Sequence, residues 1–210
     1  MDQLFYWDQV IFEAINSGMV NPFFDWLMPL FRNQFIWLPV YVFFAAFFVY
    51  NFPPKGFYIL LFGLLTFMLS DQLSAHILKP LAERLRPCND PVFSYFVRLL
   101  IPCGSGFSFP SAHATNHFAF SVFLISVIPL RMRWVLPFAL IWASGVCFAQ
   151  VYVGIHYPLD VIFGALLGAS IGLVTSSLCK NILRLNLDRA EEEEEVIENE
   201  PEEWTDKQQE

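Results

Sequence analysis

Charged residues are scarce in this sequence. Asp, Glu, Lys and Arg together make up 15% of its 210 residues, whereas 56% are hydrophobic and the mean hydropathy is +0.48. An ordinary soluble domain carries about 25% charged residues, so this composition argues against a water-soluble protein and for one embedded in a membrane. Residues 1–18 are not expected to be a secretory signal peptide, because they have neither a basic start nor a long apolar run.

Hydrophobic runs long enough to cross a bilayer take up most of the chain. A span needs roughly 20 helical residues, and five stretches of about this length are bounded by polar or turn residues: 34–52, 57–79, 110–128, 135–153 and 159–178. The stretch 57–79 is apolar only as far as Leu69. Gln72, His76 and Lys79 then follow at helical spacing, which predicts a polar stripe facing the interior of a bundle. The alternative is a helix that simply emerges into the headgroups.

The two ends of the chain differ from its middle. Residues 1–18 interleave apolar and acidic side chains, which is typical of an amphipathic helix lying at a membrane interface. Residues 188–210 hold 12 of the 20 acidic residues and cannot bury a core, so we expect a disordered acidic tail there. Residues 1–187 are then one membrane domain. The expected fold is all-α, a polytopic membrane helical bundle of about five transmembrane helices plus the N-terminal interfacial helix.

Five spans place the connections alternately on the two sides of the membrane. The N-terminal helix, the loop 80–109 and the turn at His156 share one side, and the acidic tail lies on the other. Five basic residues fall on the first side and seven on the second, which favours the second as cytoplasmic. We therefore expect a multi-pass membrane protein with the first side facing the periplasm or exterior, and its small size and short loops favour a bacterial inner membrane. Cys88 and Cys103 both belong to the loop on that side. They can form a disulfide there or remain two buried thiols, and the sequence favours neither alternative.

Three polar stretches meet on that side: "KPLAERLRP" from residue 79, "FPSAH" from residue 109 and "HYPLD" from residue 156. Lys79 offers a point charge, and the planar fork of Arg86 suits phosphate oxygens. Ser111 and the backbone N–H groups of Ala112 and His113 begin a span, where free amides and the helix dipole attract anions. Each of these features alone has a common structural explanation, because basic side chains near helix ends reach the headgroups and proline followed by serine starts many helices. Together they predict a phosphate site.

Two histidines and a carboxylate add reactive groups to this site. Asp160 lies one helical turn after His156 and can fix the tautomer of its ring, which leaves the other ring nitrogen free to attack. His113 can supply a proton to a leaving oxygen. The alternative is a pair of unrelated capping histidines with an aspartate that neutralises a helix dipole.

The three stretches, in this order, resemble the signature motifs of the type 2 phosphatidic acid phosphatase superfamily of membrane lipid phosphatases, which is related to soluble vanadium haloperoxidases. The resemblance implies a phosphatase that needs no metal or other cofactor. It implies His156 as the nucleophile that forms a phospho-histidine, Asp160 as its orienting partner and His113 as the general acid. Lys79, Arg86 and Ser111 would bind the phosphoryl oxygens, with the backbone of Ala112 beside them.

Two positions depart from the family pattern. Ala112 stands where the family usually has glycine, and its N–H group survives. Gln150 stands where the family has arginine, so a donor remains but a positive charge is lost, and Lys79, Arg86 and Arg84 would have to neutralise the phosphate. The alternative function is therefore a non-catalytic membrane protein that binds or scaffolds a lipid phosphate.

The expected substrate is a lipid phosphate or diphosphate in the membrane, namely a polyprenyl diphosphate first by family analogy, then phosphatidylglycerophosphate or phosphatidic acid. No nucleic-acid partner is expected. His113 and His117 have the spacing of a zinc pair, but a third ligand is not evident, so no metal site is predicted. A further pattern, in which glycines recur every four residues, predicts a close helix contact, either within the bundle or between subunits of a homo-oligomer. These are Gly164, Gly168 and Gly172.

Overall fold

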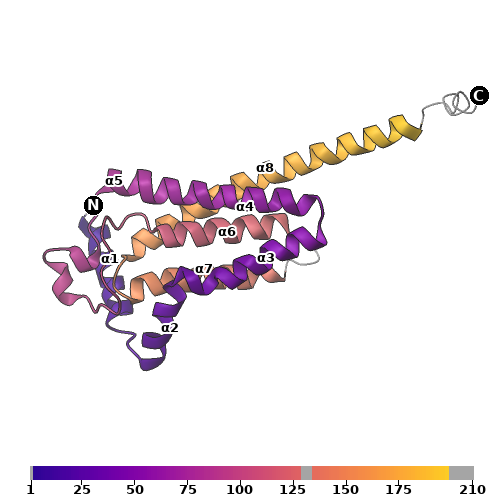
Figure 1. The fold of residues 1–210 in the computed structure, drawn as a ribbon. Helices are drawn as coiled ribbons and strands as arrows, with labels where there is room; N and C mark the ends of the chain where they lie inside the picture. Colours follow the sequence, from indigo (N-terminus) through magenta and orange to yellow (C-terminus); the bar gives the residue numbers. More distant parts are fainter. Residues whose placement is uncertain (1, 129–133, 199–210) are drawn as a thin grey trace, which may run out of the picture.

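Helices account for the regular structure of the part of the chain that the structure describes. The computed structural model describes the backbone of residues 2–128 and 134–198, and the side chains of residues 3–128 and 134–184. Within these ranges there are helices and turns and no strands. The long helices run side by side, and the short ones gather at one end of the bundle (Figure 1). The predicted all-α membrane bundle is confirmed.

The bundle consists of five long elements. Helix α4 continues without interruption through a π-helical segment, η2, into the short helix α5. Within the described residues, four elements are long and apolar enough to cross a membrane, and the central α6, with 16 residues, is shorter than they are. The elements are α3 (Leu38–Asn51, preceded by η1, Gln34–Trp37), α4 (Lys55–Asp71) with η2 (Gln72–Leu78) and α5 (Lys79–Ala82), α6 (Ala112–Val127), α7 (Val135–Tyr152) and α8 (Pro158–Glu198).

The prediction that a polar stripe at the end of the second span faces the bundle interior is wrong for two of its three residues. Gln72 and His76 are exposed, and only Lys79 is half-buried. The reason is the π-helical segment η2, whose wider turns do not keep residues three and four apart on one face.

Helix α6 lies in the middle of the bundle and packs against α4, α7 and α8 (Figure 1). Its contact with α8 is close because three glycines face it. A Cβ atom at Gly164, Gly168 or Gly172 would lie 2.6, 2.2 or 2.5 Å from the carbonyl oxygen of Ser111, Thr115 or Ala119, respectively. The glycine repeat therefore makes a contact within one chain, and association of two chains through it stays a prediction.

The N-terminal segment forms two helices at one end of the bundle (Figure 1). Helix α1 spans Asp2–Asn16, as the amphipathic pattern predicts, and α2 spans Pro22–Arg32. The sequence reading missed α2. Its signal is Asn21 followed by Pro22, because the Asn21 side chain accepts a hydrogen bond from the N–H of Phe24 and proline suits the first helical position.

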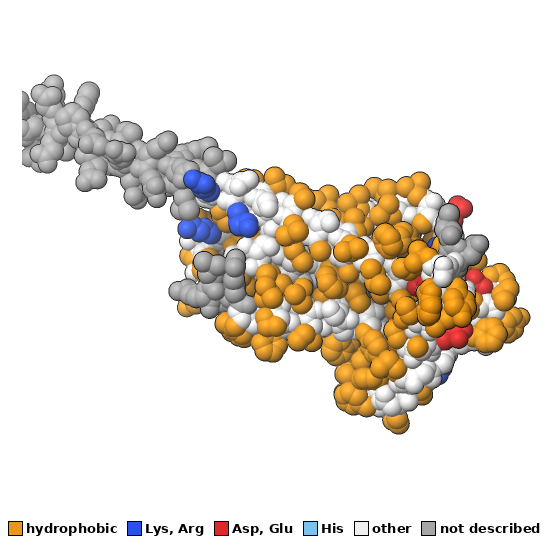
Figure 2. All heavy atoms as spheres, turned by 180° about the vertical axis from the view of Figure 1, so that it is seen from behind, with side chains coloured by type: hydrophobic (Ala, Val, Ile, Leu, Met, Phe, Trp, Pro, Cys, Tyr) orange, Lys and Arg blue, Asp and Glu red, His pale blue; other side chains and the backbone are white. Residues whose placement is uncertain are grey.

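Apolar side chains cover much of the bundle surface, and charged side chains gather at its two ends (Figure 2). Acidic groups lie at the end that carries α1, and basic groups lie at the end that α8 leaves. Such a belt between polar ends is what a lipid environment requires. Helix α8 continues beyond the bundle to Glu198 (Figure 1), so the predicted tail boundary at residue 188 lies inside this helix. Residues 199–210 lie outside the described residues, and the disordered tail stays a prediction.

Candidate active site

The turn between α7 and α8 carries His156 into the protein interior. Gly154 adopts φ +91° there, and a Cβ atom at this position would lie 2.8 Å from the carbonyl oxygen of Arg98, so glycine is required. The amide of Asn16 donates hydrogen bonds of 2.8 Å to the carbonyl oxygens of Arg98 and Tyr152. These contacts tie the turn to α1 and to the long loop, and His156 is left only 2% exposed.

Asp160, in the first turn of α8, lies beside the ring of His156. Its Oδ2 atom is 3.6 Å from Nδ1 of His156, which is longer than a hydrogen bond. The hydroxyl of Ser108 closes the gap, because it donates to Asp160 Oδ2 and lies 3.2 Å from His156 Nδ1. The N–H of Tyr157 donates to the same carboxylate oxygen at 2.9 Å. The predicted pairing of His156 with Asp160 is therefore supported by a third residue, Ser108, that the sequence reading missed.

Burial governs the protonation of His156. It lowers the pKa of the ring to about 4, although the neighbouring Asp160 opposes this shift. The ring is therefore neutral at physiological pH, as a nucleophile has to be.

Arg84 joins the carboxylate of Asp160 to helix α1. Its Nη1 donates to Asp160 Oδ1 at 2.7 Å, and its Nη2 is ion-paired with Asp8. The guanidinium also lies 4.2 Å from the centre of the Tyr157 ring. Since two carboxylates neutralise Arg84, the expectation that it shares in phosphate neutralisation is not supported.

Asp8 itself is fully buried, and its second oxygen accepts a hydrogen bond of 2.8 Å from the N–H of Leu159. Burial raises the pKa of Asp8, and the hydrogen bonds from Arg84 and Leu159 oppose that rise. The sequence reading took Asp8 as part of a polar helix face. No local pattern pairs it with Arg84, which lies 76 positions away.

Lys79 and Arg86 are held without a carboxylate partner. Lys79 begins α5 and is half-buried, and Arg86 is 8% exposed. Among the residues with described side chains, ion pairs of lysine or arginine occur at Arg84 and Arg98 and not at these two. Arg86 donates from Nε to the carbonyl oxygen of Gly106 at 3.3 Å, which leaves the other edge of its guanidinium available to an anion.

A disulfide between Cys88 and Cys103 ties the segment after Arg86 to the loop before α6. It joins residues 15 positions apart, and the Arg86 guanidinium lies beside Gly104 in that loop. Of the two alternatives for these cysteines, the structure shows the disulfide. The cross-link limits how far the arginine can move from the start of α6.

The start of α6 brings Ser111, Ala112 and His113 to the same place. Ser111 is the N-cap, its hydroxyl accepts from the N–H of Ala114, and its own N–H donates to the Asp160 carbonyl oxygen at 2.9 Å. The N-termini of α6 and α8 are thereby joined, which brings His113, in the first turn of α6, to the same end of the bundle as His156, just before α8. The hydroxyl of Ser111 accepts at the helix cap and keeps its own proton to donate, so it and the backbone N–H groups of Ala112 and His113 can together face an anion.

His117 and Gln150 complete the list of polar groups near the site. His117 accompanies His113 on α6 but packs against the Trp142 ring, and the described residues contain no cluster able to hold a metal ion. Gln150 is buried on α7, and both polar atoms of its side chain lack a hydrogen-bond partner among the described residues.

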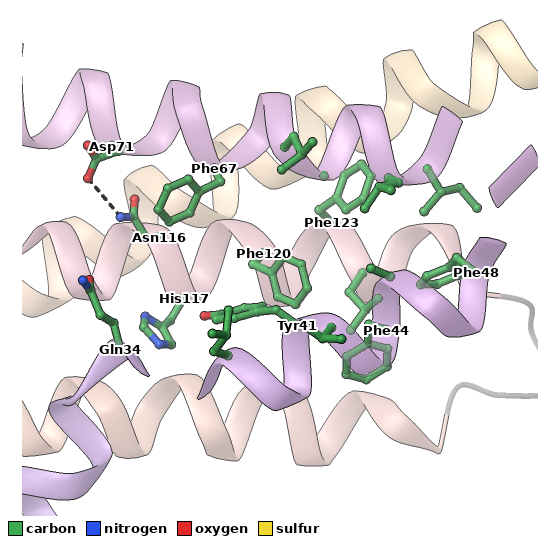
Figure 3. A pocket seen from close by; sticks show the side chains of 18 of the residues that line it. Gln34, Tyr41, Phe44, Phe48, Phe67, Asp71, Asn116, His117, Phe120 and Phe123 are labelled. Atoms are coloured by element: carbon green, nitrogen blue, oxygen red, sulfur yellow. Dashed lines mark hydrogen bonds between the residues drawn. The ribbon is translucent and has the colours of Figure 1, made fainter. Parts of the chain in front are cut away.

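A cavity of about 610 Å³ runs from the start of α6 along the bundle, between α3, α4 and α6 (Figure 3). At one end lie Ala112, His113 and Gln34, and phenylalanines such as Phe44, Phe67 and Phe120 line the rest. Asn116 and Asp71 form the main polar contact on its wall, at 3.2 Å. The cavity can therefore take an apolar chain whose polar end lies at His113.

Comparisons with known proteins agree with this geometry. Residues 57–184 match the family model of the PAP2 superfamily. The chain is 35% identical over 155 residues to a lipid A 4'-phosphatase of Bacteroides thetaiotaomicron, covering 72% of this chain and 68% of that protein. It is 27% identical to a lipid A 4'-phosphatase of Porphyromonas gingivalis, covering 82% of this chain and 72% of the relative. The crystal structure of a transmembrane PAP2-type phosphatidylglycerolphosphate phosphatase from Bacillus subtilis has the same fold, with a TM-score of 0.69, 22% identity and coverage of 87% of this chain and 89% of the other.

Proposed function

Because the chain belongs to the PAP2 superfamily, whose lipid phosphatases are membrane proteins of this fold, we propose that it hydrolyses a lipid phosphate with His156 as the nucleophile. The observation that carries this proposal is the set of contacts that Asp160, Ser108 and Arg84 make around His156. A buried histidine oriented in this way, beside unpaired cations, suits phosphoryl transfer better than passive binding.

The reaction follows from the placement of the two histidines. Nδ1 of His156 faces Ser108 and Asp160, so Nε2 attacks phosphorus, the bond from Nε2 to phosphorus forms and the bond from phosphorus to the lipid oxygen breaks. His113 gives a proton to that leaving oxygen. A water molecule then attacks the phospho-histidine, the nitrogen–phosphorus bond breaks, and the proton of the water returns to His113. Lys79, Arg86, the Ser111 hydroxyl, the Gln150 amide and the free N–H groups of Ala112 and His113 hold the phosphoryl oxygens, so positive groups of the protein supply the charge stabilisation and no metal takes part.

The proposed substrate is a lipid with a phosphate monoester or diphosphate at the membrane surface. Its acyl or prenyl chain lies in the apolar cavity and its phosphate lies at His113. Two relatives that this chain covers over more than two thirds of their length are lipid A 4'-phosphatases. We therefore place lipid A ahead of the polyprenyl diphosphate that family analogy favours, with phosphatidylglycerophosphate and phosphatidic acid after them.

The site faces the periplasm or exterior in this proposal, and the C-terminal tail lies in the cytoplasm. Two features support it. Basic side chains gather at the end of the bundle opposite the site (Figure 2), and the Cys88–Cys103 disulfide at the site end suits an oxidising compartment.

The experiment is phosphate release by the purified protein in detergent with a chelator present, from each of the four lipid classes. The variants are His156→Asn and, as the matched control, His76→Asn, because the His76 side chain is 64% exposed and makes none of the contacts around His156. Release by the native chain and by His76→Asn, with loss in His156→Asn, is the expected result. Absence of release from every lipid, with phosphate still bound, would instead establish the alternative of a lipid-phosphate binding protein, and activity gained only in Gln150→Arg would assign the loss to Gln150.

A further inference from the structure

The positive side chains near the site fall into two groups. Arg84 and Arg98 are ion-paired with carboxylates. Among the residues with described side chains, Lys79, Arg86 and Arg32 have no such partner. The first two belong to the motif that the sequence singles out. Arg32 does not, and it comes from α2, a helix outside all three motifs.

Arg32 is held in place although it makes no ion pair. It is the last residue of α2, and its Nε atom is buried without a hydrogen-bond partner among the described residues. The preceding Phe31 fixes the end of the helix, because its ring lies where a Cβ atom of Gly145 on α7 would be, at 2.8 Å. The neighbouring Trp37 donates to the Phe31 carbonyl oxygen at 2.8 Å.

Helix α2 packs on the stretch of α7 that carries Gln150. Met28 of α2 forms one cluster with Ala149 and Tyr152, which lie one residue before and two residues after that glutamine. The end of α2 also leads into Gln34, which lines the cavity beside His113. Arg32 therefore lies two residues before the cavity wall, on a helix that packs against the stretch of α7 that carries Gln150.

The positive charge of Arg32 repels that of Arg86, and Arg86 in turn repels Lys79. The charge of Arg32 also disfavours a positive charge on His113. Burial lowers the pKa of Arg32, so its charge is costly to keep there. Such a chain of like charges in a partly buried place is unfavourable unless an anion joins it. A phosphate group among them removes the repulsion and fills the open edge of each donor.

We infer that Arg32 binds the phosphoryl group and supplies the positive charge that Gln150 does not. This inference rests on the proposed function, because it assigns a third cation to the same phosphate site. It also explains how this chain keeps enough positive charge there without an arginine at position 150. Helix α2 is then part of the catalytic site and not only a cover for α7.

The test uses the full chain in detergent and two measurements. The first is the inhibition constant of inorganic phosphate in the phosphate-release assay. The second is the rise in melting temperature caused by inorganic phosphate, which does not depend on turnover. The variants are Arg32→Gln, Arg32→Lys, Gln150→Arg and the double variant Arg32→Gln/Gln150→Arg. The matched control is Arg184→Gln, since Arg184 is exposed near the far end of α8.

Arg32→Gln is expected to weaken phosphate binding roughly 10- to 100-fold, the effect of losing one charge-assisted hydrogen bond. Arg32→Lys should fall in between, because it keeps the charge without the planar fork. The double variant should recover most of the loss, which a merely structural role for Arg32 would not allow. Arg184→Gln should match the native chain in both measurements.

The inference is overturned if Arg32→Gln binds phosphate as tightly as Arg184→Gln, or if it binds weakly but the double variant recovers nothing. The proposed function fails separately. Suppose that the native chain releases no phosphate from any lipid while its thermal stabilisation by phosphate still depends on Arg32. The inference that Arg32 binds phosphate then stands, and the proposed phosphatase activity is wrong.

Discussion

Arg84 donates a hydrogen bond of 2.7 Å to Asp160, and through its other terminal nitrogen the same guanidinium is ion-paired with Asp8. Asp160 belongs to the helix that follows His156, whereas Asp8 belongs to the N-terminal helix α1. The orientation of His156 therefore depends on a segment that lies outside the family match at residues 57–184. This relationship makes α1 a structural support of the proposed nucleophile.

Asp8→Asn tests that support. The substitution leaves Arg84 with Asp160 as its one carboxylate, and removing one partner of a buried pair destabilises a protein by about 3 kcal/mol. The melting temperature should fall, and phosphate release should slow with little change in KM, because Arg84 then draws more of the Asp160 charge away from His156. Glu13→Gln on the exposed face of the same helix is the control. Equal melting temperatures and rates for the two variants would show that the Asp8 contact is incidental.

The pH dependence of stability reports on His156. Burial lowers the pKa of its ring from 6.5 to about 4, so between these values the unfolded chain binds a proton that the native ring does not. The free energy of unfolding should fall as the pH drops from about 6.5 to about 4, by up to roughly 1.4 kcal/mol per pH unit from this group. The measurement is the melting temperature against pH for the native chain and for His156→Asn, whose difference isolates this ring from the other histidines. Parallel curves would mean that His156 is not held neutral.

The close contact of α6 with α8 can be tested at Gly168. A Cβ atom there would lie 2.2 Å from the carbonyl oxygen of Thr115, so Gly168→Ala should push the helices apart and destabilise the bundle by about 1–3 kcal/mol. Gly63→Ala is the control, since its Cβ atom would lie 3.6 Å from the Phe123 ring, an ordinary contact. The expected result is a lower melting temperature for Gly168→Ala only. A similar melting temperature for both variants would argue that α6 and α8 are less closely packed.

Much of the fold could be predicted because its signals are local. The length of each apolar run sets the spans, and the sequence from His156 to Asp160 places the histidine just before a helix and the aspartate in its first turn. The polar stripe at Gln72 and His76 failed for a local reason too, since a π-helical segment changes which residues share a face.

The supporting residues of the site could not be predicted in the same way. Ser108 meets Asp160 across 52 positions, and Asp8 meets Leu159 across 151. Such contacts depend on how the helices pack in three dimensions, and the sequence around Asp8 resembles an ordinary amphipathic helix. Arg32 could not be predicted as a site residue either. Its proposed role depends on its lack of a carboxylate partner, which becomes apparent only when α2 lies against α7.

The most direct test of the central claim is to trap the covalent intermediate. Purified protein is mixed with a lipid substrate labelled in its phosphate, in the presence of chelator, and quenched in alkali within milliseconds. The account predicts label bound to the native chain through a bond that is stable in alkali and cleaved by acid, located at His156 and absent from His156→Asn. Label that persists in His156→Asn, or phosphate release that continues in that variant, would contradict the assignment of His156 as the nucleophile.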